Sequence, residues 1–384
     1  MLFSTLLSAE SNVCNIFFDG TTNDKTQGTN VWNMFNALEG SVTRYTPSRS
    51  SDLNKDSVEA LYKTGSNSRA VYVPGVGTST TLGDYEKNLQ AYSGKGIERR
   101  ALVGYAFLTN ICEVQFGKTY ELKIVGFSRG ATTAIMFATY LSLFGISIAN
   151  TVPIGPFNGL TSFEQTLLTG DQNTKNSRGR IPQITFLGLF DTVASIGFAT
   201  RLNPGEHLTF WGKIIKNRLG EEYLCKLSIK IPLIVEKLAH AVAINEYREA
   251  FHPTLINKDS PKWVEMFFIG SHSDIGGFKN SERQKIALSW MVQQGFQETL
   301  KKLFLAPGYI LNLRGSPLTN SYDDFTILEG PYTRPVDWKA CSVDTLAVAK
   351  DGHLSRIEWI QVTKSLENAL KEANKAIEDE NKQR

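Results

Sequence analysis

The chain has 384 residues, of which 41% are hydrophobic and 21% charged, and its formal net charge is +3 at pH 7. This composition is typical of a globular protein and excludes an intrinsically disordered chain. The net charge is too small to favour a nucleic acid as partner, and no run approaches the roughly 18 apolar residues of a membrane span. The length allows one large domain with insertions, or two ordinary domains.

The cysteines are few, widely separated and without a C-x-x-C pair: Cys14, Cys112, Cys225 and Cys341. We therefore expect neither a metal site nor a disulfide framework, and folding in a reducing compartment is the default. The segment 1–9 is apolar but lacks a basic start, and Glu10 follows it. The sequence thus predicts no cleaved signal peptide and synthesis in the cytoplasm.

Predicted strands and helices alternate along most of the chain, which indicates an α/β fold with a mostly parallel central sheet flanked by helices. Apolar runs bounded by turn residues predict the strands 13–18, 70–73, 122–125, 184–190 and 264–269. Helical spacing of apolar residues predicts the helices 31–38, 97–116, about 131 to 144, 238–248 and 286–304.

The remaining segments are predicted to be loops or excursions from the core. Residues 41–69 are polar and Ser-rich, which favours a loop with little order. We expect a catalytic domain over 1–306 and a C-terminal extension over 307–384. Lid-like insertions are expected at about 150–180 and 201–235; the second mixes aromatic and basic residues, as in an interfacial helix, although a surface helix packed on the core remains an alternative.

The sequence Gly126-Phe127-Ser128-Arg129-Gly130 stands between a predicted strand and a predicted helix. A Gly-x-Ser-x-Gly turn in this context is the nucleophile elbow, in which a strained corner exposes the serine hydroxyl at the carboxyl edge of the sheet. Side chains at Gly126 or Gly130 would collide with the crowded strand and helix. We therefore predict Ser128 as a nucleophile.

An acid and a base follow two later strands. Asp191 comes directly after the strand 184–190, and His272 follows the strand 264–269. A serine needs a histidine to accept its proton, and the histidine needs a carboxylate to orient it, so Ser128, Asp191 and His272 are a candidate triad. Asp191 as a mere turn or helix cap, and Asp274 as the acid, remain alternatives.

A strand-end loop is expected to supply part of an oxyanion hole. The first donor is the backbone N–H of Arg129, which follows the nucleophile. Gly20 and Thr21, in the polar turn after the first strand, are candidates for the second donor. Asp19 is expected to hold this loop. Gly75 and Gly77 form a weak phosphate-binding pattern that is better explained by a tight turn.

These motifs together resemble an α/β-hydrolase family of bacteria and fungi that includes the type VI secretion phospholipase effectors. The resemblance covers roughly residues 13–280. It rests on the segments 18–21 (FDGT), 126–131 (GFSRGA), 190–195 (FDTVAS) and 270–277 (GSHSDIGG), with 239–248 (AHAVAINEYR) as a further helix motif. One departure is Phe278, where the family often has a third glycine, and another is the shorter chain.

The resemblance implies a serine ester hydrolase, foremost a phospholipase of A1 or A2 type that acts on membrane phospholipids of rival bacteria. It implies delivery by a type VI apparatus into a target cell periplasm, with a secretion-spike component and an immunity protein as further partners. No cofactor is expected, and the calcium requirement is left open. An esterase or thioesterase on soluble substrates, and a catalytically silent binding module, are the alternatives.

Overall fold

The computed structural model describes residues 11–45, 58–79, 83–84, 87, 96–146, 180–193, 228–229, 231–246, 248, 251, 253–256, 260–268, 270–278 and 282–296. The predicted insertion at 150–180 lies outside these residues except for residue 180, and that at 201–235 lies outside them except for 228–229 and 231–235. The extension 307–384 lies outside them entirely. None of the described helices is long and apolar enough to cross a membrane.

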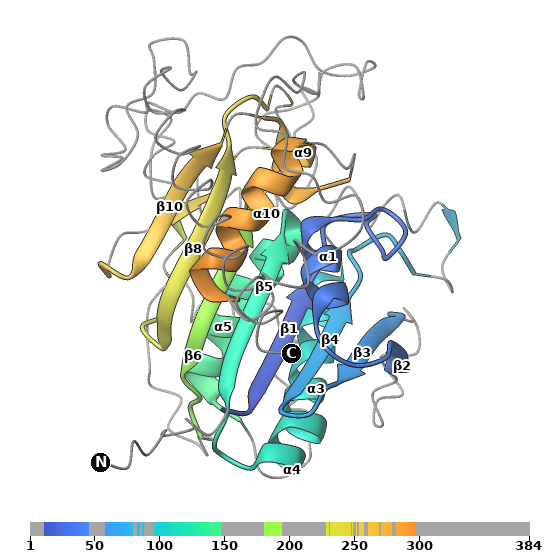
Figure 1. The fold of residues 1–384 in the computed structure, drawn as a ribbon, viewed down its shortest axis with the longest axis vertical. Coiled ribbons are helices and arrows are strands. Elements are labelled where there is room, and N and C mark those ends of the chain that lie inside the picture. The colour runs from blue at the N-terminus through green and yellow to red at the C-terminus, as the bar shows by residue number, and fades with distance from the viewer. Residues whose placement is uncertain are drawn as a thin grey trace, which may run out of the picture.

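An eight-stranded sheet in the order β10-β8-β6-β5-β1-β4-β3-β2 forms the centre of the described fold (Figure 1). Its strands are β1 (Val13–Phe18), β2 (Thr43–Tyr45), β3 (Ala60–Thr64), β4 (Ser68–Val73), β5 (Glu121–Phe127), β6 (Ile184–Phe190), β8 (Val235–Ala243) and β10 (Trp263–Phe268). The pairs from β10 to β4 are parallel, whereas β3 and β2 join antiparallel at one edge. The predicted α/β class with a mostly parallel sheet is confirmed. A small separate sheet pairs β7 (Ser228–Ile229) with β9 (Leu255–Ile256).

Helices cover both faces of this sheet (Figure 1). They are α1 (Asn30–Ala37), α3 (Ile97–Phe107), the π-helix η2 (Leu108–Cys112), α4 (Glu113–Phe116), α5 (Arg129–Phe144), α9 (His272–Gly276) and α10 (Glu282–Gly295). Alternate residues of each strand enter different cores, as their period of two requires. Ile16 and Phe18 pack in a core with residues of α3 and α5, while Phe17 packs in another with residues of α1 and α10.

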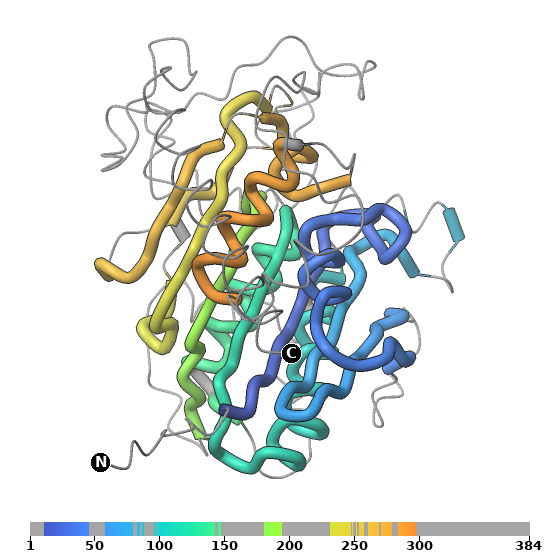
Figure 2. Tube along the Cα trace, viewed as in Figure 1, coloured from blue at the N-terminus to red at the C-terminus, as the bar shows by residue number. Residues whose placement is uncertain are grey.

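The chain begins in the middle of the sheet and extends it in both directions. After β1 it forms β2, β3 and β4 on one side, then crosses to β5 on the other side and continues outward to β10 (Figure 2). In open α/β sheets, ligand sites lie at the carboxyl ends of the strands where the direction of winding reverses. Here that point is the carboxyl end of β1, between β4 and β5.

The structure corrects two predicted elements. Residues 235–243 form the strand β8, paired with β6 and β10, where the sequence predicted a helix over 238–248. Its Glu, Lys, Leu and Ala residues have high helix propensity, but pairing on both sides within the sheet overrides this preference. The segment 41–69, predicted as a loop with little order, contributes the edge strand β2 and its neighbour β3.

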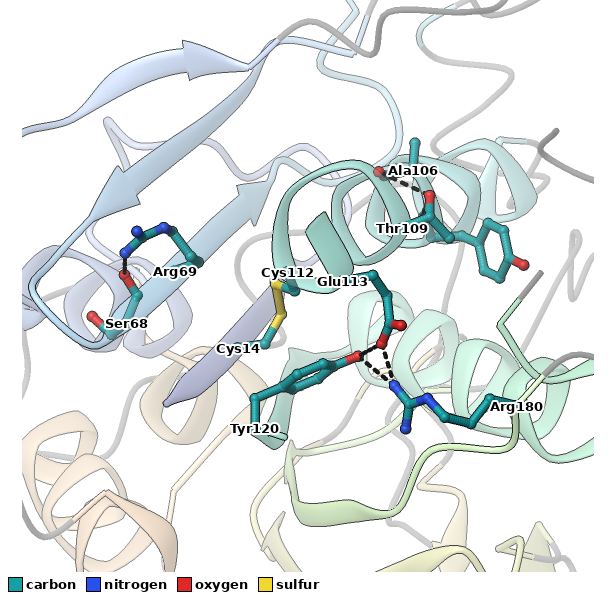
Figure 3. The surroundings of a disulfide bond; sticks show 10 residues. Cys14, Ser68, Arg69, Ala106, Thr109, Cys112, Glu113, Tyr120 and Arg180 are labelled. Atoms are coloured by element: carbon teal, nitrogen blue, oxygen red, sulfur yellow. Dashed lines mark hydrogen bonds and ion pairs between the residues drawn. A yellow bond between two sulfur atoms is a disulfide. The ribbon is translucent and has the colours of Figure 1, made fainter. Parts of the chain in front are cut away.

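The expectation of no disulfide was wrong. Cys14 on β1 is bonded to Cys112 at the end of η2, across a sequence separation of 98 residues (Figure 3). Both cysteines are fully buried. Nearby, Glu113 accepts hydrogen bonds from Tyr120 and Arg180, so that the start of α4, the turn before β5 and the approach to β6 are tied together (Figure 3).

Candidate active site

The predicted site residues come from neighbouring strands that end at the same edge of the sheet. Phe127, the last residue of β5, is paired with Phe190, the last residue of β6. Phe190 is paired with Ala241 on β8, and Ala243 on the same strand is paired with Phe268, the last residue of β10. The segments that follow these strands therefore meet, although they lie far apart in the sequence.

Ser128 occupies a strained corner between β5 and α5. Its φ of 56° and ψ of −124° lie in a region that residues with a side chain rarely adopt. The glycines on either side make the corner possible, because a Cβ on Gly126 would stand 2.4 Å from the carbonyl oxygen of Gly130, and one on Gly130 would stand 2.3 Å from that of Phe18. This is the geometry of a nucleophile elbow.

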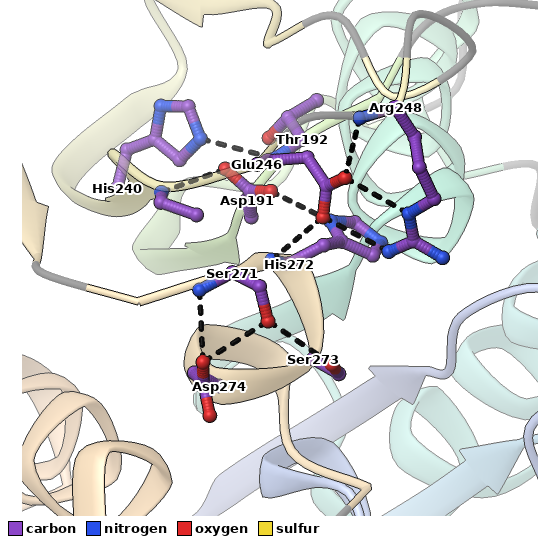
Figure 4. Close-up of polar contacts among 10 residues, drawn as sticks. Asp191, Thr192, His240, Glu246, Arg248, Ser271, His272, Ser273 and Asp274 are labelled. Carbon is purple, nitrogen blue, oxygen red and sulfur yellow. Dashed lines mark hydrogen bonds and ion pairs between the residues drawn. The ribbon is translucent and has the colours of Figure 1, made fainter. Parts of the chain in front are cut away.

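Asp191 is fully buried at the end of β6, with a φ of 38°. Its N–H donates to the carbonyl oxygen of Ala241 (2.7 Å), and its Oδ1 accepts from the N–H of Ala243 (2.8 Å). Its Oδ2 lies 2.6 Å from Nδ1 of His272 (Figure 4). The backbone of β8 thus aims this carboxylate at the imidazole, and Asp191 does not serve merely as a cap.

His272 is the first residue of α9 and is buried. Its ring contacts the rings of Phe127 and Phe251, with centroid distances of 4.6 and 4.7 Å. Burial lowers the pKa of this imidazole below its ordinary 6.5, although Asp191 acts in the opposite direction. The ring is therefore neutral at pH 7, and donation from Nδ1 to Asp191 leaves Nε2 with its lone pair, as a general base requires.

The structure links Ser128 to the other two groups through backbone and ring contacts. The N–H of Ser128 donates to the carbonyl oxygen of Phe190 (2.9 Å), the residue before Asp191. Phe127, the residue before Ser128, contacts the His272 ring. No hydrogen bond joins the hydroxyl of Ser128 to the imidazole within the described part of the chain. Such contacts often tighten only when substrate binds.

The loop after β1, which holds the predicted oxyanion donors Gly20 and Thr21, lies against the elbow. A Cβ on Gly20 would stand 3.3 Å from Cβ of Ser128, and the Oγ1 of Thr21 accepts from Nη1 of Arg129 (2.9 Å). The N–H of Gly20, however, donates to Oδ1 of Asp19 across 2.7 Å. Of the two candidate donors in this loop, the Gly20 amide therefore already has an acceptor.

Asp19 holds this loop through hydrogen bonds to both of its carboxylate oxygens. Its Oδ2 accepts from the hydroxyls of Thr29 (2.6 Å) and Tyr72 (2.5 Å), while Oδ1 accepts from Gly20. Burial raises the pKa of its carboxyl from 3.8 to about 6, although the three hydrogen bonds oppose the shift.

Burial also lowers the pKa of the Arg129 guanidinium to about 10, so that this side chain stays cationic at pH 7.

Sequence reasoning assigned no role to Glu246 and Arg248, which hold the candidate base His272 in place. The N–H of His272 donates to Oε2 of Glu246 (3.1 Å) (Figure 4). Arg248 binds the same carboxylate through Nε (2.8 Å) and Nη2 (2.9 Å), and its guanidinium lies 3.8 Å from the centre of the Phe251 ring. The i, i+2 pair of opposite charges was visible in the sequence, but its contact with a residue 26 positions later was not.

A second buried pair holds the segment of the candidate acid Asp191. His240, which was predicted on a helix, lies on β8 with no exposed surface, and its Nδ1 is 2.8 Å from Oε2 of Glu265 on β10. Its Nε2 accepts from the N–H of Thr192 (3.2 Å), the residue after Asp191 (Figure 4). Because Nε2 accepts, the ring proton lies on Nδ1, which donates a hydrogen bond to Glu265.

Asp274, the alternative acid, has a different function in the structure. Its Oδ2 accepts from both the N–H (2.9 Å) and the hydroxyl (3.0 Å) of Ser271 and so caps the start of α9.

Among the described residues, no group of three or more His, Cys, Asp or Glu side chains has an arrangement that could hold a metal ion.

A family profile described as the catalytic domain of Tle1-like phospholipase effectors of the type VI secretion system matches residues 14–294. This match covers most of the chain. The chain belongs to the Tle1-like family. No match was found among curated proteins.

Two solved structures similar to this Tle1-like chain are both longer than it. A crystal structure of an uncharacterized protein from Pseudomonas aeruginosa is 18% identical, with a TM-score of 0.37, and the match covers 75% of this chain and 46% of that one. The Tle1 effector bound to the VgrG spike of the type VI secretion system is 21% identical, with a TM-score of 0.35. That match covers 71% of this chain and 51% of the effector chain. The Tle1-like chain thus spans about half the length of these structures.

Proposed function

We propose that this chain is a serine ester hydrolase that removes a fatty acid from phospholipids, as a phospholipase of A1 or A2 type. The observation that carries the proposal is the 2.6 Å contact of Asp191 with a neutral, buried His272, whose ring lies against the residue preceding a strained Ser128. Membership of the Tle1-like phospholipase effector family supports the substrate class.

In the proposed reaction, the Oγ of Ser128 attacks the ester carbonyl while Nε2 of His272 takes the hydroxyl proton. Asp191 stabilises the imidazolium that results. The carbonyl oxygen becomes an oxyanion, which receives hydrogen bonds from the backbone N–H groups of Arg129 and Thr21. The N–H of Gly20 would join them only by leaving Asp19.

Collapse of the tetrahedral intermediate breaks the ester bond, and His272 gives its proton to the departing lysophospholipid oxygen. The acyl group is then bonded to Ser128. A water molecule, activated by the same imidazole, attacks the acyl carbonyl and releases the fatty acid, which regenerates the serine hydroxyl. The cycle consumes one water molecule for each ester bond and needs no redox partner.

The family also supports a proposal for delivery. We infer that the chain is made in the cytoplasm, binds a spike component of a type VI apparatus and acts in the periplasm of a target cell, where an immunity protein would neutralise it. A solved Tle1 effector is bound to the VgrG spike, which supports the spike as a partner.

The proposed chemistry is tested by fatty-acid release from mixed phospholipid vesicles. Ser128→Ala should abolish release while the protein stays folded. Ser142→Ala is the matched control, because Ser142 lies on the same helix α5, where its hydroxyl bonds to the carbonyl of Thr139. Cleavage of a short-chain ester without release from vesicles would favour the soluble-substrate esterase, and inactivity on both substrates would favour the silent binding module.

A further inference from the structure

Phe278 combines an exposed aromatic ring with an unfavourable backbone conformation. Its side chain is 51% exposed, and its φ is 144°. This part of backbone space is readily open to glycine but costly for a residue with a large side chain. Strain of this kind persists only where the surrounding structure imposes it, and it is concentrated at functional sites.

The surrounding structure holds this segment firmly. Gly277 forms an antiparallel bridge with Thr29, and the N–H of Phe278 donates to Oε1 of Gln284 (3.4 Å). Gln284 is buried and also donates from Nε2 to the carbonyl oxygen of Gly28 (2.8 Å). The backbone at Gly277 and Phe278 is therefore bonded to two different segments, and the ring of Phe278 is left half exposed.

The same contacts place Phe278 at the rim of the candidate active site. Gly276 lies so close to Phe127 that an added Cβ would overlap its ring, and Phe127 precedes Ser128. Thr29, the bridge partner of Gly277, donates a hydrogen bond from its hydroxyl to Asp19, which holds the loop after β1. Gly277 is one residue and Gly276 two residues from Phe278. Because consecutive Cα atoms are about 3.8 Å apart, Phe278 lies close to both of these contacts.

Its position separates Phe278 from the other exposed large hydrophobic side chains of the described residues: Val42, Val114, Ile181 and Leu233. Ile181 and Leu233 precede β6 and β8 and so lie toward the opposite, amino edge of the sheet. Single exposed apolar residues are common on protein surfaces. The location and the strained backbone together, rather than exposure alone, require an explanation for Phe278.

We propose that Phe278 is a lipid-contacting residue, whose ring enters the surface of a phospholipid bilayer and brings the catalytic edge of the sheet against it. This inference rests on the proposed phospholipase function. A half-exposed ring offers far less than the roughly 800 Å² that each partner contributes to a stable protein interface, whereas an aromatic ring is well suited to the boundary between acyl chains and headgroups.

The proposal predicts different effects on stability and on lipid binding. Phe278→Gly relieves the backbone strain but also loses the buried half of the ring, two effects of similar size, so the melting temperature should change little. Hydrolysis of phospholipid vesicles should fall by about tenfold, the scale expected for losing the burial of half an aromatic side chain. Hydrolysis of a monomeric short-chain ester should not change. Phe278→Trp should retain hydrolysis of vesicles.

A binding measurement tests the proposal independently of the chemistry. Co-sedimentation with vesicles of phosphatidylethanolamine and phosphatidylglycerol is compared for Ser128→Ala and for Ser128→Ala combined with Phe278→Gly. The matched control combines Ser128→Ala with Leu233→Gly, which removes a side chain that is 80% exposed near the opposite edge.

The proposal is supported if, of the three proteins, only the one that carries Phe278→Gly sediments less with the vesicles. Equal sedimentation of all three proteins overturns it, as does an equal loss of activity on vesicles and on the soluble ester. Failure of the proposed function is recognised separately, because the unsubstituted protein would then release no fatty acid even where the binding measurement supports a role for Phe278.

Discussion

The backbone N–H of His272 donates a hydrogen bond to Oε2 of Glu246 across 3.1 Å. A buried carboxylate thus holds the backbone at the start of α9, and with it the imidazole, in addition to the contact of the ring with Asp191. Arg248 neutralises this carboxylate and also lowers the pKa of His272, because a cation nearby disfavours the imidazolium. The Glu246–Arg248 pair therefore acts on both the position and the protonation of the proposed base.

Arg248→Gln should move the acid limb of the pH profile of kcat/KM to higher pH. Without the cation, and with the carboxylate of Glu246 left uncompensated, His272 keeps its proton to a higher pH and is inactive as a base over a wider acid range. Arg44→Gln is the control, because Arg44 forms an exposed ion pair with Glu59. A lower kcat with an unmoved acid limb would show that Arg248 only supports the local structure.

Asp19→Asn should make stability less dependent on pH between about 4 and 6. The pKa of this carboxyl is raised from 3.8 to about 6 in the folded protein, so the folded state binds the proton more tightly than the unfolded chain. The resulting stability is complete below pH 3.8 and is lost as the pH rises through about 6, on the order of 3 kcal/mol in total. Urea unfolding at pH 4 and pH 7 measures the difference.

The lowered pKa of His272 acts in the opposite direction: its stabilising contribution is present above 6.5 and is lost as the pH falls. It is common to wild type and Asp19→Asn and cancels when the two are compared. The free energy of unfolding is compared between pH 4 and pH 7 for each protein. If it changes by the same amount in wild type and in Asp19→Asn, the prediction is contradicted.

Glu265→Ala should destabilise the protein by about 3 kcal/mol, because it leaves His240 without its partner in the core and the N–H of Ile256 without an acceptor. It should also lower kcat, since His240 accepts the N–H of Thr192 and so positions the loop of Asp191. Denaturant unfolding and activity per folded molecule measure the two effects.

The matched control for this buried pair is Glu236→Ala. Glu236 forms an ion pair with Lys262 in which both side chains are exposed, and such pairs contribute within about 1 kcal/mol. Equal effects of the two substitutions would refute the distinction between a buried and an exposed pair.

Cys14→Ala combined with Cys112→Ala should lower stability by about 2–4 kcal/mol, because the disulfide closes a loop of nearly 100 residues and restricts the unfolded chain. Reductant should have the same effect on the unsubstituted protein, but slowly, since both cysteines are fully buried. Thermal unfolding with and without reductant measures this. A melting temperature that neither treatment changes would contradict the prediction.

The sequence by itself determined the features that depend on neighbouring residues. The strand, the glycines at 126 and 130 and the following helix specify the elbow locally, because only glycine fits those two positions. The apolar runs of β1, β6 and β10, each followed by a polar turn, indicated where Asp19, Asp191 and His272 lie. Parallel strands bring such turns to one edge, so the sequence predicted that Asp191 and His272 lie at the same edge of the sheet. Their 2.6 Å contact was decided by the pairing of β6 and β10 with β8.

Contacts between distant segments were decided only by the tertiary structure. The segment of β8 has helix-forming residues, yet pairing with β6 and β10 makes it a strand and places His240 beside Glu265. The bond between Cys14 and Cys112 depends on how η2 lies against β1, which no local pattern records. The strain at Phe278 likewise arises from Thr29 and Gln284, because backbone strain is imposed by what surrounds a residue and not by its own sequence.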